Sequence, residues 1–482
     1  MDSGSIKQKL GLLVAGVVLS VGIFMPKGAE SMTLSTMTPN RGTVSISVIL
    51  TGSMSSTWNY GDKVWIDFGT SQTLVTATSD SGSGAFTINF NVNTQSYGTQ
   101  YITVYHINEG PGDQENIVTT TFFILPNIYY SQPVSGPVGT LITIKGSGFT
   151  KDSSVALEFG TSLDTDLNAS IDSGNQFGTF SANFRVNTQF AGTKVITAID
   201  ASGRKATTIF IINPFIHCLD PPSATVGITV TIQGNGYGSG SLVGIGFGTN
   251  QTITTTIAST SGTFSTTFTV DTQPGGSQVI TAKDADGNLQ TTVFWIKCKI
   301  YLVAPGSGYV EDTITIEASG FMSTELVRID FGTHQTITTV QMTGINNSNG
   351  TFSTTFAIST QKYGNKDITV LGQILGNTDV YINAVKILSR ITVVNPSTTT
   401  VGSSVTVEGT GFDYTGVDNV NVYLGAPTSE TFLGDAVLYN SGTFSEVFTI
   451  NTKPYGTKVI TAKSEGGASP DAWATSTLFI TP

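Results

Sequence analysis

Histidine is the side chain best suited to general-base or metal-binding chemistry near neutral pH, and this chain of 482 residues has three. His106, His217 and His334 each fall in a different copy of the repeat described below. A catalytic site needs several polar groups that converge, commonly an acid or base with an orienting partner. The sequence contains no nucleophile elbow, phosphate loop or two-histidine zinc helix. We therefore expect no catalytic residues and no resident cofactor.

The stretch Asp284-Ala285-Asp286-Gly287-Asn288 is similar to the start of a calcium-binding loop. A complete loop of this kind needs further oxygen ligands and a closing glutamate, which this stretch lacks. The corresponding stretch of an earlier copy reads Asp200-Ala201-Ser202-Gly203. We favour a hairpin turn here, and the alternative is a calcium site with Asp284 and Asp286 as ligands.

An aromatic motif, Trp58-Asn59-Tyr60, has no counterpart in the other copies. Exposed aromatic side chains can stack on sugars or anchor a protein partner. The alternative, which we favour, is that they fill a local core in a divergent copy. Trp58 and Tyr60 are therefore our candidates for a contact with a partner.

The two cysteines, Cys218 and Cys298, lie at the start and the end of one copy. In a seven-strand sandwich the chain enters at one pole and leaves at the other, which exceeds the ~7 Å between Cα atoms that a disulfide allows. We expect no bond between them within the chain. Isolated thiols are favoured over a bridge between neighbouring molecules.

Composition excludes several classes of protein. The 22 Lys and Arg residues against 33 Asp and Glu residues give a net charge of −11, which argues against nucleic-acid binding. Two cysteines are too few for a disulfide scaffold or a cysteine-rich zinc site. Hydrophobic residues make up 39% of the chain, enough to bury a core, and its length predicts several domains.

The N-terminal segment has the order of features found in secretory signals. Lys7 and Lys9 precede an uncharged apolar stretch, residues 10–25, and Ala29-Glu30-Ser31 offers a cleavage site. The stretch is shorter than the ~20 residues that span a bilayer comfortably, so we favour a cleaved signal over an uncleaved anchor. We expect a secreted or cell-surface protein with no membrane span in its mature part.

A tandem repeat governs the rest of the chain. A glycine followed two residues later by phenylalanine recurs five times: Gly84-Ala85-Phe86, Gly178-Thr179-Phe180, Gly262-Thr263-Phe264, Gly350-Thr351-Phe352 and Gly442-Thr443-Phe444. A Phe-Gly-Thr string precedes it in four copies, and an Asn-Thr-Gln-like string follows it: 68–70, 159–161, 247–249 and 331–333; 93–95, 187–189, 271–273, 359–361 and 451–453. The fifth copy departs, with Leu424-Gly425-Ala426 and Lys453. Strings that stay in step over five copies identify a repeat.

Each copy has the pattern of β-structure. Residues 264–270 place Phe264, Phe268 and Val270 on one face and small polar side chains on the other, a period of two. Turn signals such as Asn235-Gly236 separate such runs. About seven short strands in roughly 90 residues is typical of a β-sandwich. We predict an all-β chain of five tandem sandwiches.

Residues 133–149, from Pro133 to Phe149, resemble the opening of an IPT/TIG domain, an immunoglobulin-like fold. The run Val155-Ala156-Leu157-Glu158-Phe159-Gly160 is similar to that family's strand ending in Phe-Gly. The openings at residues 222–237 and 396–412 repeat the pattern, and that at 305–321 does so loosely. The second half of each copy resembles immunoglobulin-like repeats of bacterial or archaeal surface proteins. The resemblance implies the fold and names no partner.

We place the signal peptide or anchor at 1–31, a divergent domain at 32–126, and further domains at 127–213, 214–298, 299–394 and 395–482. The links between them are short and mix proline with β-branched and aromatic residues, unlike flexible tethers. We therefore expect an elongated array. A folded-back cluster would need apolar faces between domains, whereas the exposed strand faces read mostly as serine and threonine.

The function favoured by these features is a non-catalytic structural or assembly protein of a microbial cell envelope, such as a surface layer, sheath or fibre. The alternative is an adhesin or glycan-binding protein with a specialised first domain, and an enzyme or its accessory is least favoured. The expected partners are other copies of the chain, other cell-surface proteins or glycans, and no nucleic acid. No cofactor is expected, calcium being the one alternative.

Overall fold

The computed structural model describes residues 31–54, 63–78, 84–107, 114–161, 176–343, 347–413, 419–451, 453–464 and 472–482. The expected signal segment and the motif with Trp58 and Tyr60 lie outside the described residues. Among the residues that are described, no helix has the length and the apolar run required to cross a membrane. The described residues pack into two compact units, one drawn from 1–134, 141–184 and 194–210 and the other from 135–140, 185–193 and 211–482.

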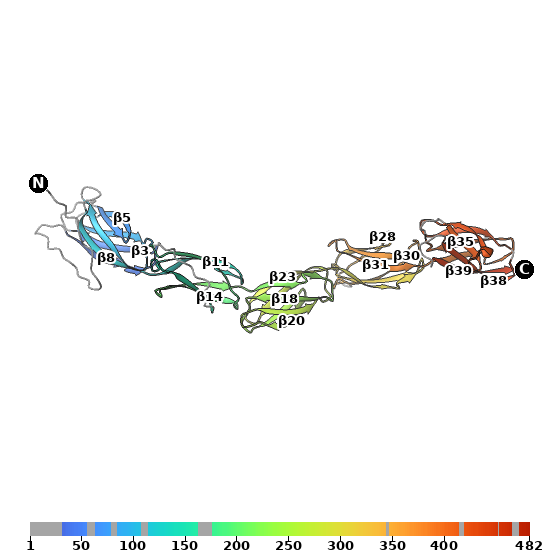
Figure 1. The fold of residues 1–482 in the computed structure, drawn as a ribbon, viewed down its shortest axis with the longest axis horizontal. Helices are drawn as coiled ribbons and strands as arrows, with labels where there is room; N and C mark the ends of the chain where they lie inside the picture. Colours follow the sequence, from blue (N-terminus) through green and yellow to red (C-terminus); the bar gives the residue numbers. More distant parts are fainter. Residues whose placement is uncertain are drawn as a thin grey trace. The chain divides into compact units, whose positions relative to one another are not determined.

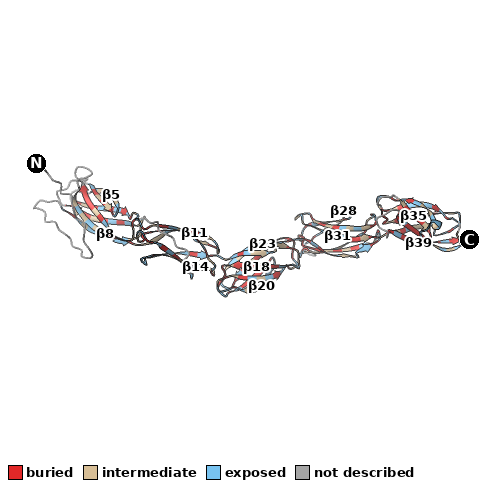
Figure 2. Ribbon diagram, viewed as in Figure 1, coloured by how far each residue is buried: buried red, intermediate tan, exposed pale blue. Residues whose placement is uncertain are grey.

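Alternation of side chains explains why these residues form strands. In β21 (Phe264–Thr269) the rings of Phe264 and Phe268 are buried, while Ser265 and Thr269 face solvent. Figure 2 shows the same alternation of buried and exposed positions along the other strands. One apolar face per strand obliges two sheets to pack against each other, and the fold is all-β as predicted.

The described strands form ten sheets, and each of five successive segments supplies a smaller sheet of three strands and a larger one of four or five. Figure 1 shows the ribbons of these sheets. The smaller sheets, in strand order, are β1 (Met32–Thr38), β3 (Ser47–Met54), β6 (Ala85–Asn91); β13 (Phe180–Arg185), β11 (Leu141–Ser147), β9 (Asn127–Gln132); β16 (Phe215–Asp220), β18 (Thr229–Asn235), β21; β24 (Lys299–Ala304), β26 (Thr313–Ser319), β29 (Phe352–Ala357); and β32 (Arg390–Asn395), β34 (Ser404–Thr410), β37 (Phe444–Thr449).

The larger sheets repeat one strand order. They are β2 (Arg41–Gly42), β8 (Gln114–Ile124), β7 (Gly98–Ile107), β4 (Lys63–Phe68), β5 (Ser71–Thr78); β10 (Ser135–Gly136), β15 (Lys205–Ile212), β14 (Gly192–Asp200), β12 (Val155–Phe159); β17 (Ser223–Ala224), β23 (Leu289–Ile296), β22 (Gly276–Asp284), β19 (Leu242–Phe247), β20 (Asn250–Ile257); β25 (Ser307–Gly308), β31 (Thr378–Ile387), β30 (Gly364–Gly372), β27 (Leu326–Phe331), β28 (His334–Gln341); and β33 (Thr398–Thr400), β39 (Trp473–Thr481), β38 (Gly456–Ser464), β35 (Asn419–Leu424), β36 (Phe432–Val437).

Each segment begins with a strand that changes sheets. In the third segment β16 pairs with β18, and the chain then crosses so that β17 runs parallel to β23, with Ala224 opposite Ile296. A cis X-Pro bond stands at the crossing in all five segments: Thr38-Pro39, Gln132-Pro133, Asp220-Pro221, Ala304-Pro305 and Asn395-Pro396. In every segment the short strand after the crossing pairs in parallel with the closing strand.

The first, third, fourth and fifth segments each have a buried cluster of their own. One buried cluster contains Phe247, Phe268 and Phe294, which come from both sheets of the third segment. The next cluster begins with Cys298 and includes Phe321. Cys298 therefore packs in the core of the fourth segment, although we placed it at the end of the third domain. Cys218 and Cys298 are both free.

Candidate functional site

The glutamine of the Asn-Thr-Gln string is buried and forms hydrogen bonds with the main chain of the Phe-Gly-Thr turn. We call this pair of hydrogen bonds the glutamine lock. In the third segment the Nε2 of Gln273 donates to the carbonyl of Phe247 at 2.8 Å, and its Oε1 accepts the N–H of Thr249 at 2.9 Å. Gln361 makes the same two bonds, to Phe331 at 3.0 Å and from Thr333 at 2.9 Å. The two strings therefore keep step in the sequence because they bond to each other in the fold.

The glycine of that turn is required by the same lock. Gly248 has a φ of +53°, and a β-carbon there would lie 1.8 Å from the Oε1 of Gln273. A side chain would meet both an unfavourable backbone conformation and the buried amide. In the fifth segment the glutamine is replaced by Lys453, which instead donates to the carbonyl of Glu430 at 3.1 Å. In that copy the turn sequence and the glutamine that would bond to it have therefore changed together.

A second recurring position supplies a buried acceptor at the end of the larger sheet. In the strand pairing, each residue at this position lies opposite a valine near the start of the neighbouring strand. The five residues are His106, Asp200, Asp284, Gly372 and Ser464, opposite Val64, Val155, Val243, Val327 and Val420. Asp284 accepts the N–H of Gly238 at 2.7 Å, and Asp200 accepts that of Thr150 at 3.0 Å. Ser464 accepts the N–H of Asp413 at 3.0 Å through its hydroxyl. The position satisfies the N–H that follows the buried aromatic residue.

The fourth segment supplies that acceptor from a different strand. Gly372 has no side chain, and the carboxylate of Glu325 accepts the N–H of Met322 at 2.7 Å instead. Glu325 is completely buried, and its other oxygen accepts the N–H of Ile374 at 3.3 Å. The same main-chain donor is therefore satisfied in four segments by three kinds of side chain.

Asp284 and Asp286, the two candidate calcium ligands, have different surroundings. The predicted hairpin turn is present, and the carboxylate of Asp284 also accepts the main-chain and side-chain N–H groups of Asn288 at 2.8 and 2.7 Å. Asp286 is exposed. Among the described residues, no three His, Cys, Asp or Glu side chains lie together as a metal site would require. Asp284 is an anchor of the turn.

Hydrogen bonds shift the pKa of the related Asp200. Burial by itself raises the pKa of this carboxyl, but the main-chain N–H groups of Arg204, Thr150 and Ser202 donate to it and lower its pKa below the ordinary 3.8. The distances from Ser202 and Arg204 are both 2.9 Å. Asp200 is therefore a charged turn anchor and not a proton donor near neutral pH.

The histidines do not converge on one site. His106 is buried at the acceptor position of the first segment. His217 is exposed, with its Nδ1 3.4 Å from the amide nitrogen of Asn235. His334 is exposed, with its Nδ1 2.7 Å from the hydroxyl of Ser359. His217 and His334 thus each contact a side chain of their own segment.

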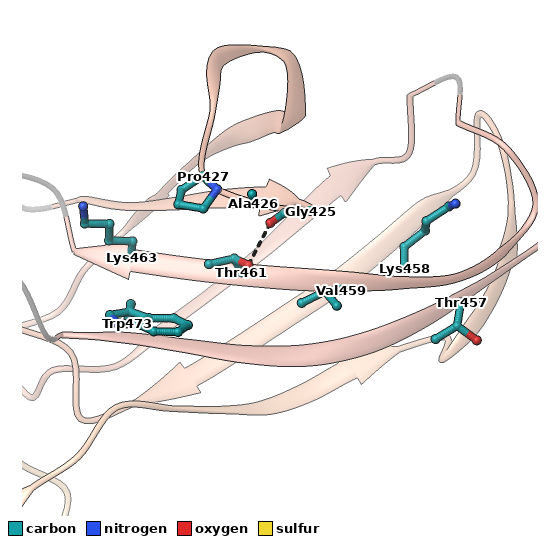
Figure 3. A pocket seen from close by; sticks show the side chains of 9 residues that line it. All are labelled: Gly425, Ala426, Pro427, Thr457, Lys458, Val459, Thr461, Lys463 and Trp473. Carbon is teal, nitrogen blue, oxygen red and sulfur yellow. Dashed lines mark hydrogen bonds between the residues drawn. The ribbon is translucent and has the colours of Figure 1, made fainter.

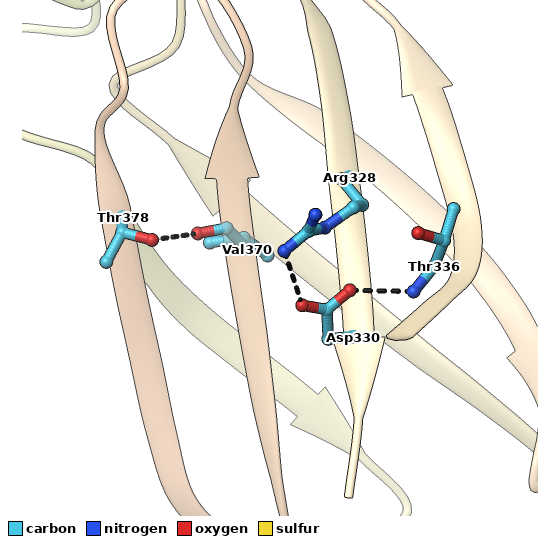
Figure 4. A network of polar contacts seen from close by, with 5 residues as sticks. All are labelled: Arg328, Asp330, Thr336, Val370 and Thr378. Carbon is cyan, nitrogen blue, oxygen red and sulfur yellow. Dashed lines mark hydrogen bonds and ion pairs between the residues drawn. The ribbon is translucent and has the colours of Figure 1, made fainter. Parts of the chain in front are cut away.

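A polar network on the larger sheet of the fourth segment is also local (Figure 4). The guanidinium of Arg328 is 3.0 Å from a carboxylate oxygen of Asp330, whose other oxygen accepts the N–H of Thr336 at 2.7 Å. The hydroxyl of Thr378 donates to the carbonyl of Val370 at 3.2 Å. The Arg328 side chain is 34% exposed, and such partly solvated ion pairs contribute little to stability. The network fastens a hairpin and forms no site.

Successive segments are joined by a main-chain hydrogen bond that recurs at four joints. A residue just after the Asn-Thr-Gln-like string donates its N–H to the carbonyl of the buried aromatic residue of the next segment. The four bonds are Tyr97 to Phe149 at 2.9 Å, Ala191 to Tyr237 at 3.1 Å, Gly275 to Phe321 at 2.8 Å and Tyr363 to Phe412 at 3.1 Å. Each joint lies within one of the two compact units.

The glycine of the Gly-Thr-Phe string completes each joint. In the fourth segment Gly350 accepts the N–H of Phe321 at 3.1 Å, and the rings of Phe321 and Phe352 lie 5.4 Å apart. Gly350 has a φ of +74°, and a β-carbon on it would come within 2.8 Å of the Cα of Pro274 in the preceding segment. The recurring glycine is thus needed by the joint as well as by the turn.

A cavity opens on the larger sheet of the fifth segment. Its volume is about 490 Å³, and it is lined by Gly425, Ala426, Pro427, Thr457, Lys458, Val459, Thr461, Lys463 and Trp473. Figure 3 shows Lys463 and Trp473 at one end and Lys458 and Thr457 at the other, with Val459 between them. The hydroxyl of Thr461 donates to the carbonyl of Gly425 at 2.8 Å and holds the rim against the sheet. Sequence reasoning noted Gly425 and Ala426 as a departure from the repeat, but it proposed none of the lining residues as a site.

Comparison with known proteins matches part of the chain to a family. Residues 126–174 match the IPT/TIG domain. A search of curated proteins finds no match. Similar solved structures include an Escherichia coli alpha-2-macroglobulin activated by porcine elastase, at 11% identity and a TM-score of 0.17, which covers 94% of this chain and 53% of that one.

Two further solved structures have names that refer to adhesion. The N-terminal eight Ig domains of Down Syndrome Cell Adhesion Molecule are similar at 15% identity and a TM-score of 0.18, covering 94% of this chain and 60% of that one. A tetra-tandem repeat of a large adhesion protein is similar at 12% identity and a TM-score of 0.20, covering 74% and 97%. This chain spans between 39% and 60% of the first four structures found. TM-scores this low carry no argument about function.

Proposed function

With residues 126–174 matching the IPT/TIG domain, we propose that this chain is a non-catalytic structural protein of a microbial cell surface, secreted through its N-terminal segment. It consists of five immunoglobulin-like domains near the boundaries predicted above, with Cys298 assigned to the fourth domain and β32 to the fifth. It assembles with other copies of itself or other surface proteins in a layer, sheath or fibre. We assign its repeated residues no role in binding a ligand. They close turns and join one domain to the next.

The recurrence of the joint is the observation that carries this proposal. Four times, a main-chain N–H of one segment bonds to the carbonyl of the aromatic residue buried in the next, at 2.8 to 3.1 Å. At the first joint the guanidinium of Arg204 also lies 4.4 Å from the centre of the Tyr97 ring, a favourable cation–π contact. A chain that repeats a fixed connection is suited to holding modules at defined spacings.

Exposed apolar side chains on the sheets support contact with other copies. Val279 and Val293 stand opposite each other on the larger sheet of the third segment and are 50% and 58% exposed. Ile209 is 56% exposed, and Ile382 is 69% exposed. The exposed faces are thus less uniformly serine and threonine than we expected. Such apolar groups favour association once a second copy covers them.

The test of assembly is electron microscopy of the full mature chain at increasing protein concentration. Ordered lattices or filaments are expected for the natural protein and are expected to be lost in a Val279→Thr, Val293→Thr double variant. Leu141→Thr, at a position 49% exposed on the smaller sheet of the second segment, is the matched control. A chain that stays strictly monomeric at high concentration contradicts the assembly role.

The elongated array expected from the sequence is tested separately by small-angle X-ray scattering. A strand of ten residues is about 33 Å long, so five domains end to end would reach about 170 Å. A pair-distance distribution that extends to this range is expected from the natural chain. A compact profile at about the dimension of a single 482-residue globule would contradict the array and leave the immunoglobulin-like fold intact.

A further inference from the structure

The fifth segment departs from the repeat at the place where the cavity lies. In the four earlier copies a Phe-Gly-Thr turn follows the strand that corresponds to β35, and in the fifth this turn is replaced by Leu424-Gly425-Ala426-Pro427. Gly425, Ala426 and Pro427 form one side of the cavity. The locking glutamine is absent as well, because Lys453 takes its place and bonds elsewhere. The fifth copy alone among the five lacks the glutamine.

Trp473 is a second departure at the same place. It stands directly opposite Lys463 in the pairing of β38 with β39. The matched residue of the third segment is Leu289, opposite Lys283, and that of the fourth is Thr378, opposite Leu371. The indole is 51% exposed. A tryptophan left half in solvent at the end of a cavity is available to stack on a flat partner.

Among the described residues that line the cavity, the charged side chains have one sign. Lys458 and Lys463 lie at its two ends (Figure 3), and none of the nine lining residues carries a carboxylate. The chain as a whole has a net charge of −11, so two lysines without a lining acid are a local reversal. Ammonium groups form strong charge-assisted hydrogen bonds with carboxylates and sulfates.

We infer that this cavity binds an acidic carbohydrate, with one sugar ring stacked on Trp473 and its anionic groups bonded by Lys463 and Lys458. Val459, 44% exposed, forms the apolar floor between the two lysines. A volume of about 490 Å³ is within the usual size of a ligand site and leaves room for a short saccharide. The anionic group is a carboxylate or a sulfate, both of which present oxygens to an ammonium group.

This inference goes beyond the structural role and does not depend on it. Binding would give the chain a contact with acidic polysaccharide in addition to contacts between copies. None of the four joints includes a residue of the cavity. Failure of the inference therefore leaves the proposed assembly role unaffected, and failure of assembly leaves this one open to test.

The test is isothermal titration calorimetry of the full chain with four probes. They are a galacturonic acid hexasaccharide, a sulfated galactose hexasaccharide, the neutral galactose hexasaccharide and inorganic phosphate. At least one acidic hexasaccharide is expected to bind, with the neutral one weaker by about tenfold or more, because it cannot form a charged hydrogen bond with the lysines. Whichever acidic probe binds more tightly identifies the anionic group. Binding should weaken as salt rises.

Variants locate the site. Trp473→Ala is expected to weaken binding about tenfold or more, Trp473→Phe to retain most of it, and Lys463→Gln to weaken it about fivefold. Trp295→Ala is the matched control, because Trp295 is an exposed tryptophan, 38% exposed, on the equivalent strand of the third segment. Thermal unfolding of each variant establishes that it is folded.

Four outcomes would overturn the inference. They are no binding of either acidic probe, equal binding of the neutral probe, binding of phosphate as tight as that of the hexasaccharides, and equal losses in Trp473→Ala and Trp295→Ala. The third would identify a simple anion site, and the fourth would place the binding elsewhere on the chain.

Discussion

Glu325 fills the space that Gly372 leaves open: a β-carbon built on Gly372 would lie 2.5 Å from the Oε2 of Glu325. In the third segment the residue at the position of Gly372 is Asp284, and its own carboxylate reaches the main-chain donor. The fourth segment thus keeps the hydrogen bond to the loop and changes the strand from which the acid comes. The carboxylate of Glu325 leaves no room for a side chain at position 372.

Exchange of these two residues is the first prediction. Glu325→Ala leaves the buried N–H of Met322 without its acceptor and is expected to destabilise the fourth segment by about 1–3 kcal/mol. Adding Gly372→Asp to that variant restores the arrangement of the third segment and should recover part of the loss. Gly372→Asp alone should destabilise, because its side chain meets Glu325. Amide hydrogen exchange of β26 and β27 in the full chain measures the three effects, and additive losses in the double variant would refute the exchange.

The glutamine lock is the second prediction. Gln273→Ala removes the partners of the Thr249 N–H and the Phe247 carbonyl, both in a part-buried turn, at an expected cost of about 1–3 kcal/mol to the third segment. Gln290→Ala is the control, since that side chain bonds only to a carbonyl at the exposed surface. The two variants are compared by their free energies of unfolding in urea and by the rate of amide hydrogen exchange at Thr249. Equal effects of the two substitutions would show that Gln273 is not a lock.

The pH dependence of the second segment is the third prediction. The folded pKa of Asp200 is lowered below its ordinary 3.8 by three main-chain N–H groups, in spite of burial. A lowered pKa stabilises the fold at pH values above the ordinary pKa, and this contribution is lost as pH falls through the folded pKa. The region around β14 should therefore become less stable to unfolding as the pH falls below about 4. Asp200→Asn should be less stable at pH 7 and show a flatter acid profile, and an unchanged profile would count against the assignment.

The joint between the third and fourth segments is the subject of the fourth prediction. Gly350→Ala places a methyl group against the Cα of Pro274 and the carbonyl of Phe321. We expect it to expose the N–H of Gly275, which donates to that carbonyl, so that its hydrogen exchange accelerates. Gly376→Ala carries a similar backbone cost, with a φ of +66°, but a β-carbon there meets open space. Faster exchange of Gly275 in both variants would mean that the methyl contact is not the cause.

The thiols give the fifth prediction. Burial raises the pKa of the Cys298 thiol to about 12, with the charges of Asp379 and Glu325 adding to the rise. At pH 8 its thiolate is then about one part in ten thousand, and the thiolate is the reactive form. Iodoacetamide should therefore label the half-buried Cys218 well before Cys298 in the folded chain. Equal labelling under native conditions, shown by mass spectrometry of the peptides, would contradict this.

Patterning predicted the strands because alternation is local: Phe264 and Phe268 fall on one face whatever lies beyond them. The recurring strings were visible as strings, and the turn at Asp284 was predicted from its own residues. Their bonding was not, because Gln273 meets Phe247 from 26 residues away, and only the packed fold brings the two together. The replacement of the acceptor at the position of Gly372 by Glu325 could not be predicted from the sequence for the same reason.

The cavity was missed for a related reason, although a signal for it was present. The Leu424-Gly425-Ala426 departure and Lys453 were visible in the sequence as exceptions to the repeat. Trp473 is far from both along the chain, and only the order β39-β38-β35 brings it to the same sheet. Exceptions that coincide in space indicate a site more strongly than either does in sequence.

The joints use the peptide groups of both partners, so their bonding requires no particular side chain at the donor. Tyrosine, alanine and glycine all serve as the donor, and phenylalanine and tyrosine both serve at the acceptor. A connection that tolerates such variety can survive gene duplication or the loss of an internal unit. Adding or removing one segment would therefore not require a new set of side chains at the donor of the joint.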